Sequence, residues 1–393
     1  MARIYMDNGA TTRVTEEVFE AMKPYFCETF GNPMSIHGFG REARKAVENA
    51  RRQVAAALGA DPSEIYFTGC GTESDNWALR GTAYAYQKKG KHIITSTVEH
   101  HAILHTCAQL EKEGFEVTYV PVDEGGLIKL DELEKAIRED TILISVMAAN
   151  NEVGTLEPVE EIAKIAKAHG VLFHTDAVQA INCVKFNVHE MGIDMLSLSG
   201  HKFHAPKGVG VLYIRKGVHP QQLIRGGAQE RNQRAGTENV ASIVGLGKAI
   251  EIAAANIDSH NAYLEKIRDH MIDRILKEIP FSRLNGHPTK RQAGNVNVSF
   301  DFIEGESLLL SLDLKGIAAS TGSACASGSL DPSHVLLAIG VPVEVAHGSL
   351  RFSMNEENTM EEADQVVDDL KEIVIRLRSL SPLYDDYMAS HKQ

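Results

Sequence analysis

A lysine at the end of an apolar segment is the first residue whose setting points to chemistry. Lys202 is the last residue of the motif Ser-Gly-His-Lys at 199–202, which begins at the last residue of the apolar segment 195–199. Lysine is costly to bury and is normally solvated. Lys202 therefore either keeps its amine in water or beside a carboxylate at a strand end, or forms an imine with a carbonyl cofactor. Taken alone, the motif favours the structural interpretation.

A carboxylate that suits such a cofactor stands at the end of another apolar segment. Asp176 and Gln179 belong to residues 174–179, His-Thr-Asp-Ala-Val-Gln. Pyridoxal 5′-phosphate (PLP) needs a carboxylate at its pyridine nitrogen, because that carboxylate keeps the nitrogen protonated and lets the ring accept electrons. Asp176 is placed for that role, and Gln179 could reach the phenolic oxygen of the ring. The structural alternatives are a helix N-cap for Asp176 and a surface polar residue for Gln179.

Residues 69–74, Gly-Cys-Gly-Thr-Glu-Ser, offer a place for the phosphate of the same cofactor. They follow a predicted strand and open a predicted helix, where backbone N–H groups and the helix dipole favour an anion. The pattern is weak alone, because many strand-to-helix turns are rich in Gly and Thr. His100 follows the segment 92–96 at a comparable place and could stack on the cofactor ring. The pair His100 and His101 does not indicate a metal site, because adjacent side chains diverge and no partner ligands are evident.

A cysteine among small residues is the second strong signal. Cys325 lies in residues 320–329, Ser-Thr-Gly-Ser-Ala-Cys-Ala-Ser-Gly-Ser. Small and flexible neighbours do not pack a core, so we expect an exposed thiol on a mobile loop that reaches a substrate and then a partner. The other four cysteines are expected to be small buried or half-buried hydrophobic residues. Among them the role of Cys70 stays open, because it lies in the candidate phosphate turn.

Short apolar segments that alternate with helical stretches must position these residues. The predicted strands are 65–68, 92–96, 117–120, 141–147, 171–175, 195–199 and 209–214, with helices starting near residues 72, 101, 130 and 158. An amphipathic helix over 40–59 precedes them. Strands that are apolar throughout and alternate with helices predict an α/β fold, with a mostly parallel central sheet covered by helices on both faces. The site is expected at the carboxyl ends of these strands.

The pattern changes after about residue 240. A long helix is predicted over 241–278, and the alternating segment 295–300 predicts a half-exposed strand. A capping box, Thr359 with Glu362, opens the last clear helix, and the tail after residue 380 is expected to fray. With 393 residues the chain is long enough for two domains. We predict a large PLP-binding domain over 15–260 and a smaller α+β domain formed by 1–14 and 261–393, which carries the Cys325 loop at about 320–333.

The composition argues against several functional classes. The net charge is -13, so nucleic acid is not expected as the main partner. No apolar run approaches the roughly 20 residues of a membrane span, and the N-terminus has no signal-peptide pattern. The five cysteines are scattered without a CxxC spacing, which indicates neither a zinc site nor a disulfide framework. Reduced thiols in a cytoplasm are the natural interpretation.

Taken together, the motifs resemble those of cysteine desulfurases of the NifS/IscS type, which are class-V aminotransferase relatives and PLP enzymes of fold-type I. The resemblance runs nearly end to end and is carried by residues 5–12, 31–33, 71–74, 149–154, 176–179, 199–202, 234–239 and 348–353. The sequence around Cys325 resembles the long-loop group of the family, and residues 229–239 resemble the NifS branch. One departure is His101, where the family leads us to expect a residue such as Pro or Lys.

The resemblance implies a role for each matching residue. Lys202 would hold PLP through an imine, and the ring and phosphate contacts would come from Asp176 at the pyridine nitrogen, Gln179 at the phenolic oxygen, His100 stacked on the ring, and Thr72, Ser199, His201 and the Gly71 backbone at the phosphate. Thr237 would reach the phosphate of the other subunit's cofactor, which implies a homodimer with a composite active site. Asn151 and Arg351 would hold the substrate carboxylate, although a structural ion pair is the alternative for Arg351.

The implied activity converts L-cysteine to L-alanine, with the sulfur held as a persulfide on Cys325. The sulfur would pass to an acceptor such as an iron–sulfur scaffold protein or a thiolation enzyme. Lys202 would take the Cα proton, and His100 would carry a proton near the sulfur. A selenocysteine lyase and a class-V aminotransferase remain alternatives, although the second would not need Cys325 in a flexible loop. A non-enzymatic sulfur or iron scaffold is disfavoured by the absence of clustered cysteines.

Overall fold

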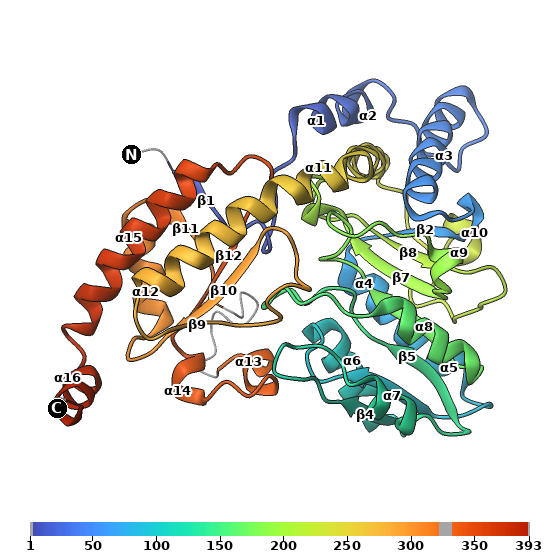
Figure 1. Ribbon diagram of the computed structural model, residues 1–393. Coiled ribbons are helices and arrows are strands. Elements are labelled where there is room, and N and C mark those ends of the chain that lie inside the picture. The colour runs from blue at the N-terminus through green and yellow to red at the C-terminus, as the bar shows by residue number, and fades with distance from the viewer. Residues whose placement is uncertain (1–2, 322–331, 392–393) are drawn as a thin grey trace.

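The larger part of the molecule is built on one seven-stranded sheet. A computed structural model describes residues 3–321 and 332–391 (Figure 1). The strands follow the order β2-β8-β7-β6-β5-β3-β4. Their bounds are β2 (Ile65–Thr68), β3 (His92–Ser96), β4 (Glu116–Val120), β5 (Thr141–Ser145), β6 (Leu172–Asp176), β7 (Met195–Ser199) and β8 (Gly210–Ile214). Every pair is parallel except those of β8, which runs antiparallel to β2 and β7. The predicted mostly parallel sheet is confirmed.

The strands are apolar throughout because each buries residues on both faces of the sheet. Along β3, Ile93 packs into one hydrophobic cluster and Ile94 into another. On β5, Leu143 packs into the same cluster as Ile93, and Ile144 packs into the same cluster as Ile94. This follows from the alternation of side chains along a strand. Strand β5 ends two residues before the predicted position 147, because the Met147 amide donates to the Glu99 carboxylate instead of a neighbouring strand.

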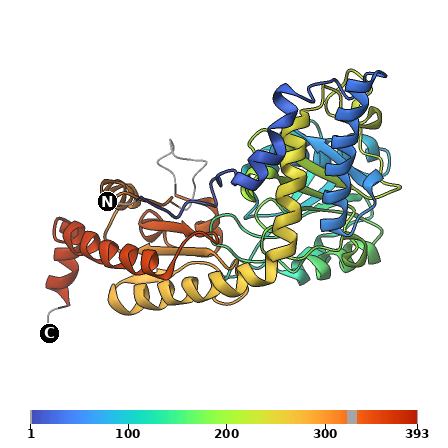
Figure 2. The same cartoon turned by 90° about the horizontal axis from the view of Figure 1, so that it is seen from above.

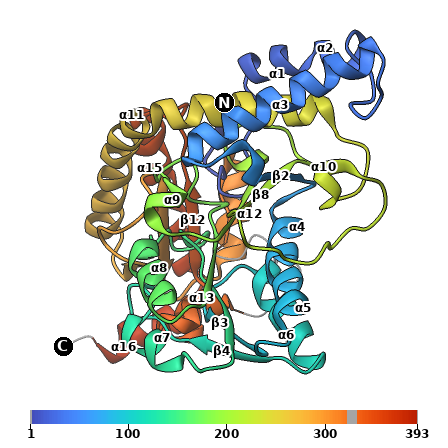
Figure 3. The same cartoon turned by 90° about the vertical axis from the view of Figure 1, so that its right-hand side faces the viewer.

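Helices cover both faces of this sheet, and Figure 3 shows them on its two sides. One cluster joins the sheet to α3 (Gly38–Leu58), α7 (Leu130–Ala136) and α8 (Val159–Ala168). The other joins it to η2 (Trp77–Gly81), α5 (Thr82–Tyr86) and α6 (His101–Lys112), and α4 (Gly71–Asn76) packs against β7 and β8. The predicted helix 40–59 is confirmed, and Gly59 ends it with a φ of 65°, a conformation that glycine adopts without steric cost.

A smaller region is built on a three-stranded antiparallel sheet. Its order is β12-β10-β9, with β9 (Ser282–Leu284), β10 (Asn295–Phe300) and β12 (Ser349–Ser353). The N-terminal β1 (Ile4–Tyr5) pairs in parallel with β11 (Ile317–Ala318) beside it. A separate hydrophobic cluster joins these strands to α12 (Gly305–Leu314), α15 (Met360–Arg378) and the second half of α11 (Val240–Glu278). The domain boundaries at residues 14 and 260 stay a prediction.

The predicted half-exposed character of β10 is wrong, because all six of its residues are buried. Val296, Val298 and Phe300 enter the smaller hydrophobic cluster. The polar face is also covered: Asn295 and Asn297 donate to the Glu152 carbonyl at 3.2 and 3.0 Å. The alternation of residue types was therefore real, but its polar half satisfies a buried hydrogen-bond network rather than facing water.

Helix α11 connects the two regions, as Figure 2 shows. It matches the predicted helix 241–278 and packs on α3 and α15. In the part of the chain that the structure describes, α11 alone is long and apolar enough to cross a membrane, which the sequence analysis did not anticipate. Half of its most apolar window is buried inside the protein, which is typical of a core helix.

Short helices complete the chain. They are α1 (Glu16–Met22), α2 (Pro24–Cys27), η1 (Pro62–Glu64), α9 (Val188–Met191), η3 (Gly200–Lys202), α10 (Gln229–Asn232), α13 (His334–Ala338), α14 (Val343–Ala346) and α16 (Pro382–Ser390). The predicted capping box of Thr359 and Glu362 is confirmed at the start of α15. The tail after residue 380 does not fray as predicted, because it forms α16, in which Tyr384 and Tyr387 pack against Phe281 and Phe302.

Candidate active site

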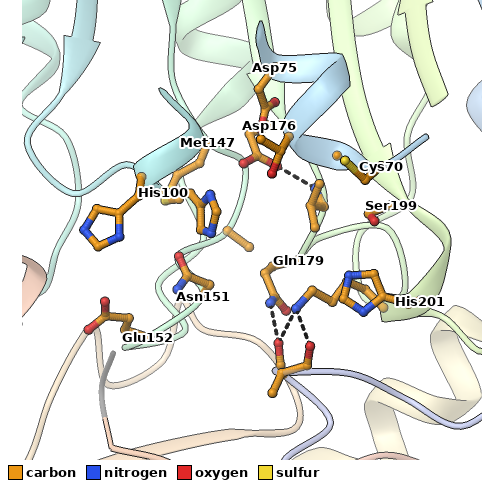
Figure 4. Close-up of a pocket in the computed structure, with 18 of the residues that line it drawn as sticks. Cys70, Asp75, His100, Met147, Asn151, Glu152, Asp176, Gln179, Ser199 and His201 are labelled. Atoms are coloured by element: carbon orange, nitrogen blue, oxygen red, sulfur yellow. Dashed lines mark hydrogen bonds between the residues drawn. The ribbon is translucent and has the colours of Figure 1, made fainter. Parts of the chain in front are cut away.

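A cavity of about 360 Å³ lies beyond the carboxyl ends of the parallel strands, where the sequence predicted the site. It falls in the size range of small-molecule sites. Figure 4 shows lining residues of the larger region around this space, and Arg351 of the smaller region also lines it. The lining includes ten predicted site residues: Gly71, Thr72, His100, Asn151, Asp176, Gln179, Ser199, His201, Lys202 and Arg351. The fold thus brings together side chains that are almost 300 residues apart in the sequence.

Lys202 reaches the cavity from η3, the turn that directly follows β7. Its Nζ donates to the carbonyl oxygens of Gly9 at 2.6 Å and Ala10 at 2.9 Å. The N-terminal segment therefore crosses the cavity and holds the amine. Backbone carbonyls orient an ammonium group without taking up its proton.

Asp176 ends β6 and is buried at the inner end of the cavity. Its Oδ1 accepts a hydrogen bond from the Val178 amide at 2.9 Å. Burial raises the pKa of Asp176 to about 6, against the opposing effects of the Val178 hydrogen bond and the positive charge of Lys202. Gln179 follows on the same turn, where its Nε2 donates to the Gly9 carbonyl at 2.9 Å. Both side chains lie in the predicted part of the site.

The predicted phosphate turn opens a helix that runs without a break through α4, η2 and α5. A Cβ at residue 71 would lie 2.8 Å from Cγ2 of Val178 and 3.3 Å from Cβ of Ser199, so the close approach of the two segments requires Gly71. Thr72 and Ser199 line the cavity beside it. Burial lowers the pKa of His201 to about 4, and its Nδ1 lies 3.2 Å from the Thr11 hydroxyl. His201 is therefore a neutral hydrogen-bonding group at neutral pH.

His100 is the N-cap of α6, and its Nδ1 accepts from the Ala102 amide at 3.1 Å. An accepting Nδ1 assigns the ring proton of the neutral imidazole to Nε2. Burial, with smaller contributions from nearby His101 and Lys202, lowers the pKa of His100 to about 4. Since this value lies below the unperturbed value of about 6.5, His100 is neutral at neutral pH, with its ring proton on Nε2.

Arg351 comes from β12 of the smaller region and is 2% exposed. Its two terminal nitrogens donate to the Asn151 carbonyl at 2.7 Å and to the Asp7 carboxylate at 3.1 Å. The ion pair that the sequence left as an alternative is thus present. The Nε of Arg351 is buried and has no hydrogen-bond partner within the described chain. A guanidinium carries five N–H donors, and these two hydrogen bonds use only two of them, so Arg351 can also donate to a ligand carboxylate.

These residues fit a PLP-type cofactor. A buried carboxylate and a lysine amine line the cavity, and a glycine turn at a helix start can receive the phosphate. Two buried polar atoms of the lining, Oδ1 of Asp75 and Nε of Arg351, lack hydrogen-bond partners in the described residues. Buried polar groups are normally paired, so the cavity has the unfilled hydrogen-bonding capacity of a ligand site.

One predicted site residue of the described chain is not among the cavity lining. Thr237 is exposed on the chain surface. Cys325 lies outside the described residues, but both flanks of that segment reach the site. On one side Ser320 and Arg351 exchange backbone hydrogen bonds, with N–O distances of 3.1 and 2.6 Å. On the other side the Ser333 hydroxyl donates to the Glu152 carboxylate.

The sequence analysis missed four side chains that line the cavity: Asp75, Met147, Glu152 and His334. Asp75 stands four residues after Gly71, a spacing that places it on the same side of a helix. Glu152 directly follows the predicted residue Asn151. Burial raises the pKa of Glu152 to about 7, against the Ser333 hydrogen bond and the charge of Arg351. Cys70 also lines the cavity, and both Cys27 and Cys70 are exposed rather than buried or half-buried as predicted.

Comparison with known proteins gives consistent matches over nearly the whole chain. A family model described as aminotransferase class-V matches residues 4–366. Cysteine desulfurase IscS of Methanosarcina thermophila is 61% identical over 97% of this chain and 94% of its own length. A solved NifS-like protein superposes with a TM-score of 0.91 at 43% identity, covering 96% of this chain and 100% of that chain. A solved complex of SspA with cysteine has a TM-score of 0.79 at 37% identity, covering 90% and 99% of the two chains.

Proposed function

The chain belongs to the aminotransferase class-V family, and from this premise and the site we infer that it is a cysteine desulfurase. It is an enzyme that takes sulfur from L-cysteine. The observation that carries this function is the convergence of an amine, a buried carboxylate and a buried guanidinium, from Lys202, Asp176 and Arg351, on one cavity. An amino acid substrate needs a cation for its carboxylate, and the amine and carboxylate match the two ends of a pyridoxal ring.

We propose that PLP is the cofactor and that this chain supplies its contacts. Lys202 would hold the aldehyde carbon, Asp176 the pyridine nitrogen, and Gln179 the phenolic oxygen. Thr72, Ser199, His201 and the Gly71 amide would hold the phosphate, and His100 would lie against the ring. When bound, PLP supplies an electron sink that weakens bonds at the Cα of an amino acid. The neutral state of His201 leaves its ring nitrogens available as hydrogen-bonding partners for a phosphate oxygen.

The residues around the substrate would divide the work of binding and proton transfer. Arg351 would hold the substrate carboxylate through N–H donors that its contacts with Asp7 and the Asn151 carbonyl leave unused, while those two contacts keep the guanidinium in place. The Lys202 amine, once free, takes the Cα proton. His100 carries its proton on Nε2, so it can donate a hydrogen bond to a sulfur atom but cannot act as a cationic acid near neutral pH.

Cys325 would receive the sulfur. Its thiolate attacks the sulfur of the substrate, the carbon–sulfur bond breaks, and a sulfur–sulfur bond forms on Cys325. The bonding electron pair stays with the carbon skeleton, and Cβ takes up one proton, equal to the one that the Cys325 thiol gives up, so that L-cysteine and the Cys325 thiol give L-alanine and a Cys325 persulfide. The hydrogen bonds of Ser320 and Ser333 support this assignment, because they hold both flanks of the segment at the cavity. The persulfide would then pass to an acceptor protein for iron–sulfur cluster assembly or other thio-cofactor synthesis.

We also propose that the active site is completed in a homodimer. Large hydrophobic side chains are exposed on one N-terminal stretch of the chain, where Phe26, Phe30 and Phe39 are 58%, 66% and 58% exposed and Ile36 is 91% exposed. Such a patch marks an interaction surface. The exposed Thr237 would reach the phosphate of the partner's cofactor. A selenocysteine lyase activity uses the same groups and stays the second candidate.

The test is a product assay on the purified enzyme with L-cysteine and a thiol reductant. Wild type should form alanine and sulfide in equal amounts, and Cys325→Ala should form neither while it stays yellow from bound PLP. Cys27→Ala is a matched control, since it removes an exposed thiol outside the cavity lining. Sulfide release by Cys325→Ala at the wild-type rate would contradict the persulfide step. A yellow wild-type enzyme that is inert toward cysteine would contradict the substrate, and selenocysteine would be tested next.

A further inference from the structure

A second buried carboxylate stands beside Asp176. Asp75 projects from α4, its side chain is 2% exposed, and it lines the cavity. Figure 4 shows its side chain next to that of Asp176 at the inner end. The Oδ1 of Asp75 has no hydrogen-bond partner in the part of the chain that is described. An orphaned oxygen of this kind is rare in a folded protein and calls for an explanation.

No cation is available to neutralise Asp75. In residues 3–321 and 332–391 its one ion-pair contact is to His174, whose Nε2 lies 3.8 Å from Oδ1. Both ring nitrogens of His174 are already engaged, Nδ1 with the Ser145 hydroxyl at 2.8 Å and Nε2 with the Ser197 hydroxyl at 2.9 Å. Burial lowers the pKa of His174 to about 3, so it is neutral. A hydrogen bond with Ser197 acts in the opposite direction and lowers the pKa of Asp75, but its effect is smaller than that of burial. A charged Asp75 would thus be a buried anion with a hydroxyl contact but no cationic partner in the described residues, which is strongly unfavourable.

The other titratable groups around Asp75 disfavour its charge as well. Asp176, Glu99 and Cys70 all raise the pKa of Asp75, which burial already places well above its ordinary value. Asp176 differs in two respects, because it accepts the Val178 amide and is favoured as an anion by Lys202. When two carboxylates are adjacent, the negative charge of one disfavours the negative charge of the other, so only one of them is ionised over a wide pH range. The negative charge of the pair therefore belongs on Asp176, and the proton belongs on Asp75.

We propose that Asp75 is a positioning residue for the pyridine end of the cofactor: it stays a neutral acid, and its O–H keeps the negative charge of the carboxylate pair on Asp176. This inference rests on the proposed binding of PLP. A single anion at that end matches a single protonated ring nitrogen. A second anion would leave uncompensated charge in the cavity, and a proton on Asp176 would leave the ring nitrogen without its counterion. Asp75 thus acts on the cofactor through Asp176.

The test compares Asp75→Asn with Asp75→Ala. Asparagine keeps the shape, the neutrality and a hydrogen-bond donor, whereas alanine removes the donor. Apoenzyme is titrated with PLP to obtain the dissociation constant, and the holoenzyme is prepared with PLP labelled by nitrogen-15, whose chemical shift reports the protonation of the ring nitrogen. The matched control is Asp194→Asn, another buried aspartate, which lies outside the cavity lining and accepts from the Phe173 amide.

Asp75→Asn should bind PLP within about threefold of wild type with an unchanged nitrogen signal, whereas Asp75→Ala should bind about tenfold or more weakly, the loss of one hydrogen bond to a charged group. In Asp75→Ala the pyridine nitrogen of bound PLP should also be less protonated than in wild type. If Asp75→Asn weakens binding and shifts the nitrogen signal, Asp75 acts as an anion and the inference is wrong. If Asp75→Ala folds and leaves both measurements unchanged, Asp75 has no role toward the ring. Failure of the wild-type protein to bind PLP would instead overturn the proposed function.

Discussion

Arg351 and Asp7 form an ion pair that joins strand β12 to the N-terminal segment at the edge of the cavity, with Nη2 and Oδ1 3.1 Å apart. The guanidinium is buried, whereas the carboxylate is partly exposed. Asp7 and the Asn151 carbonyl each use one N–H of a terminal nitrogen of Arg351, and the remaining N–H donors can serve a ligand. This arrangement fixes the plane of the guanidinium before substrate binds, and a planar group fixed in advance loses less entropy on binding.

Arg351→Lys should therefore raise the KM for L-cysteine by about tenfold or more, because an ammonium cannot serve Asp7, Asn151 and a substrate carboxylate with one planar group. Steady-state kinetics of alanine formation measure the effect. Arg376→Lys is the matched control, since Arg376 lies on the exposed part of α15. An unchanged KM in Arg351→Lys would show that the ion pair with Asp7 is its whole role.

Lys202 should be the residue that PLP labels. Reduction of the holoenzyme with borohydride should leave the cofactor attached to the peptide that contains Lys202, and mass spectrometry of a digest locates it. Lys202→Ala should show no covalent attachment, whereas Lys207→Ala, which alters an exposed lysine five residues away, should be labelled like wild type. Attachment at any other lysine would contradict the assignment.

Ser333→Ala removes the hydroxyl that donates to the buried Glu152 carboxylate, so it should lower the free energy of unfolding by about 1–3 kcal/mol. Ser333 also caps α13 by accepting from the Leu336 amide at 3.2 Å. Ser333→Thr keeps a hydroxyl and should retain most of the stability. Urea unfolding of the two variants measures the difference. Equal stability of Ser333→Ala and wild type would show that the contact with Glu152 contributes nothing.

A buried ion pair should hold the turn that precedes Thr237. Arg51 and Glu230 have 3% and 2% exposed side chains, and two of their N–O distances are 2.8 Å. The pair holds residues 230–232, which all have positive φ although none is glycine. Arg51→Met should cost about 3–5 kcal/mol of unfolding free energy, because it leaves Glu230 buried and unpaired. Denaturant unfolding measures this loss, and adding Glu230→Gln should recover part of it.

Stability should fall as the pH rises from about 6.5 to about 8. Burial raises the pKa of Glu157 from its ordinary 4.5 to about 8. Between these values the folded chain keeps a proton that the unfolded chain has lost, so unfolding becomes easier as the pH rises. The buried His100, with a pKa lowered from 6.5 to about 4, acts in the opposite sense below 6.5. The net loss is therefore clearest above that pH.

Glu157→Gln should reduce the slope of the unfolding free energy against pH. The largest reduction is that of one proton, on the order of 1.4 kcal/mol per pH unit. Urea unfolding at several pH values measures the slope. The exposed Glu160, changed to Gln, is the matched control. A slope in Glu157→Gln equal to that of wild type would show that Glu157 is ionised in the folded protein.

The sequence by itself determined the sheet, its helices and most of the candidate site. The strands over 65–68, 92–96 and 195–199 have the predicted bounds, because hydrophobic runs and turn residues are local signals. Lys202 and Asp176 were identified for the same reason, since each closes such a run. The carboxyl ends of neighbouring parallel strands meet at one edge of a sheet, so a local pattern was enough to predict that these two residues share a site.

Only the tertiary structure decided which polar groups are buried and what charge they carry. Asp75 lies in a polar stretch of sequence that reads as a helix surface, yet the packing of α4 on β7 and β8 buries it beside Asp176. The polar face of β10 is likewise covered by a loop more than 140 residues away in sequence. Burial and pKa depend on neighbours from distant segments, and the periodicity of a single segment carries no information about them.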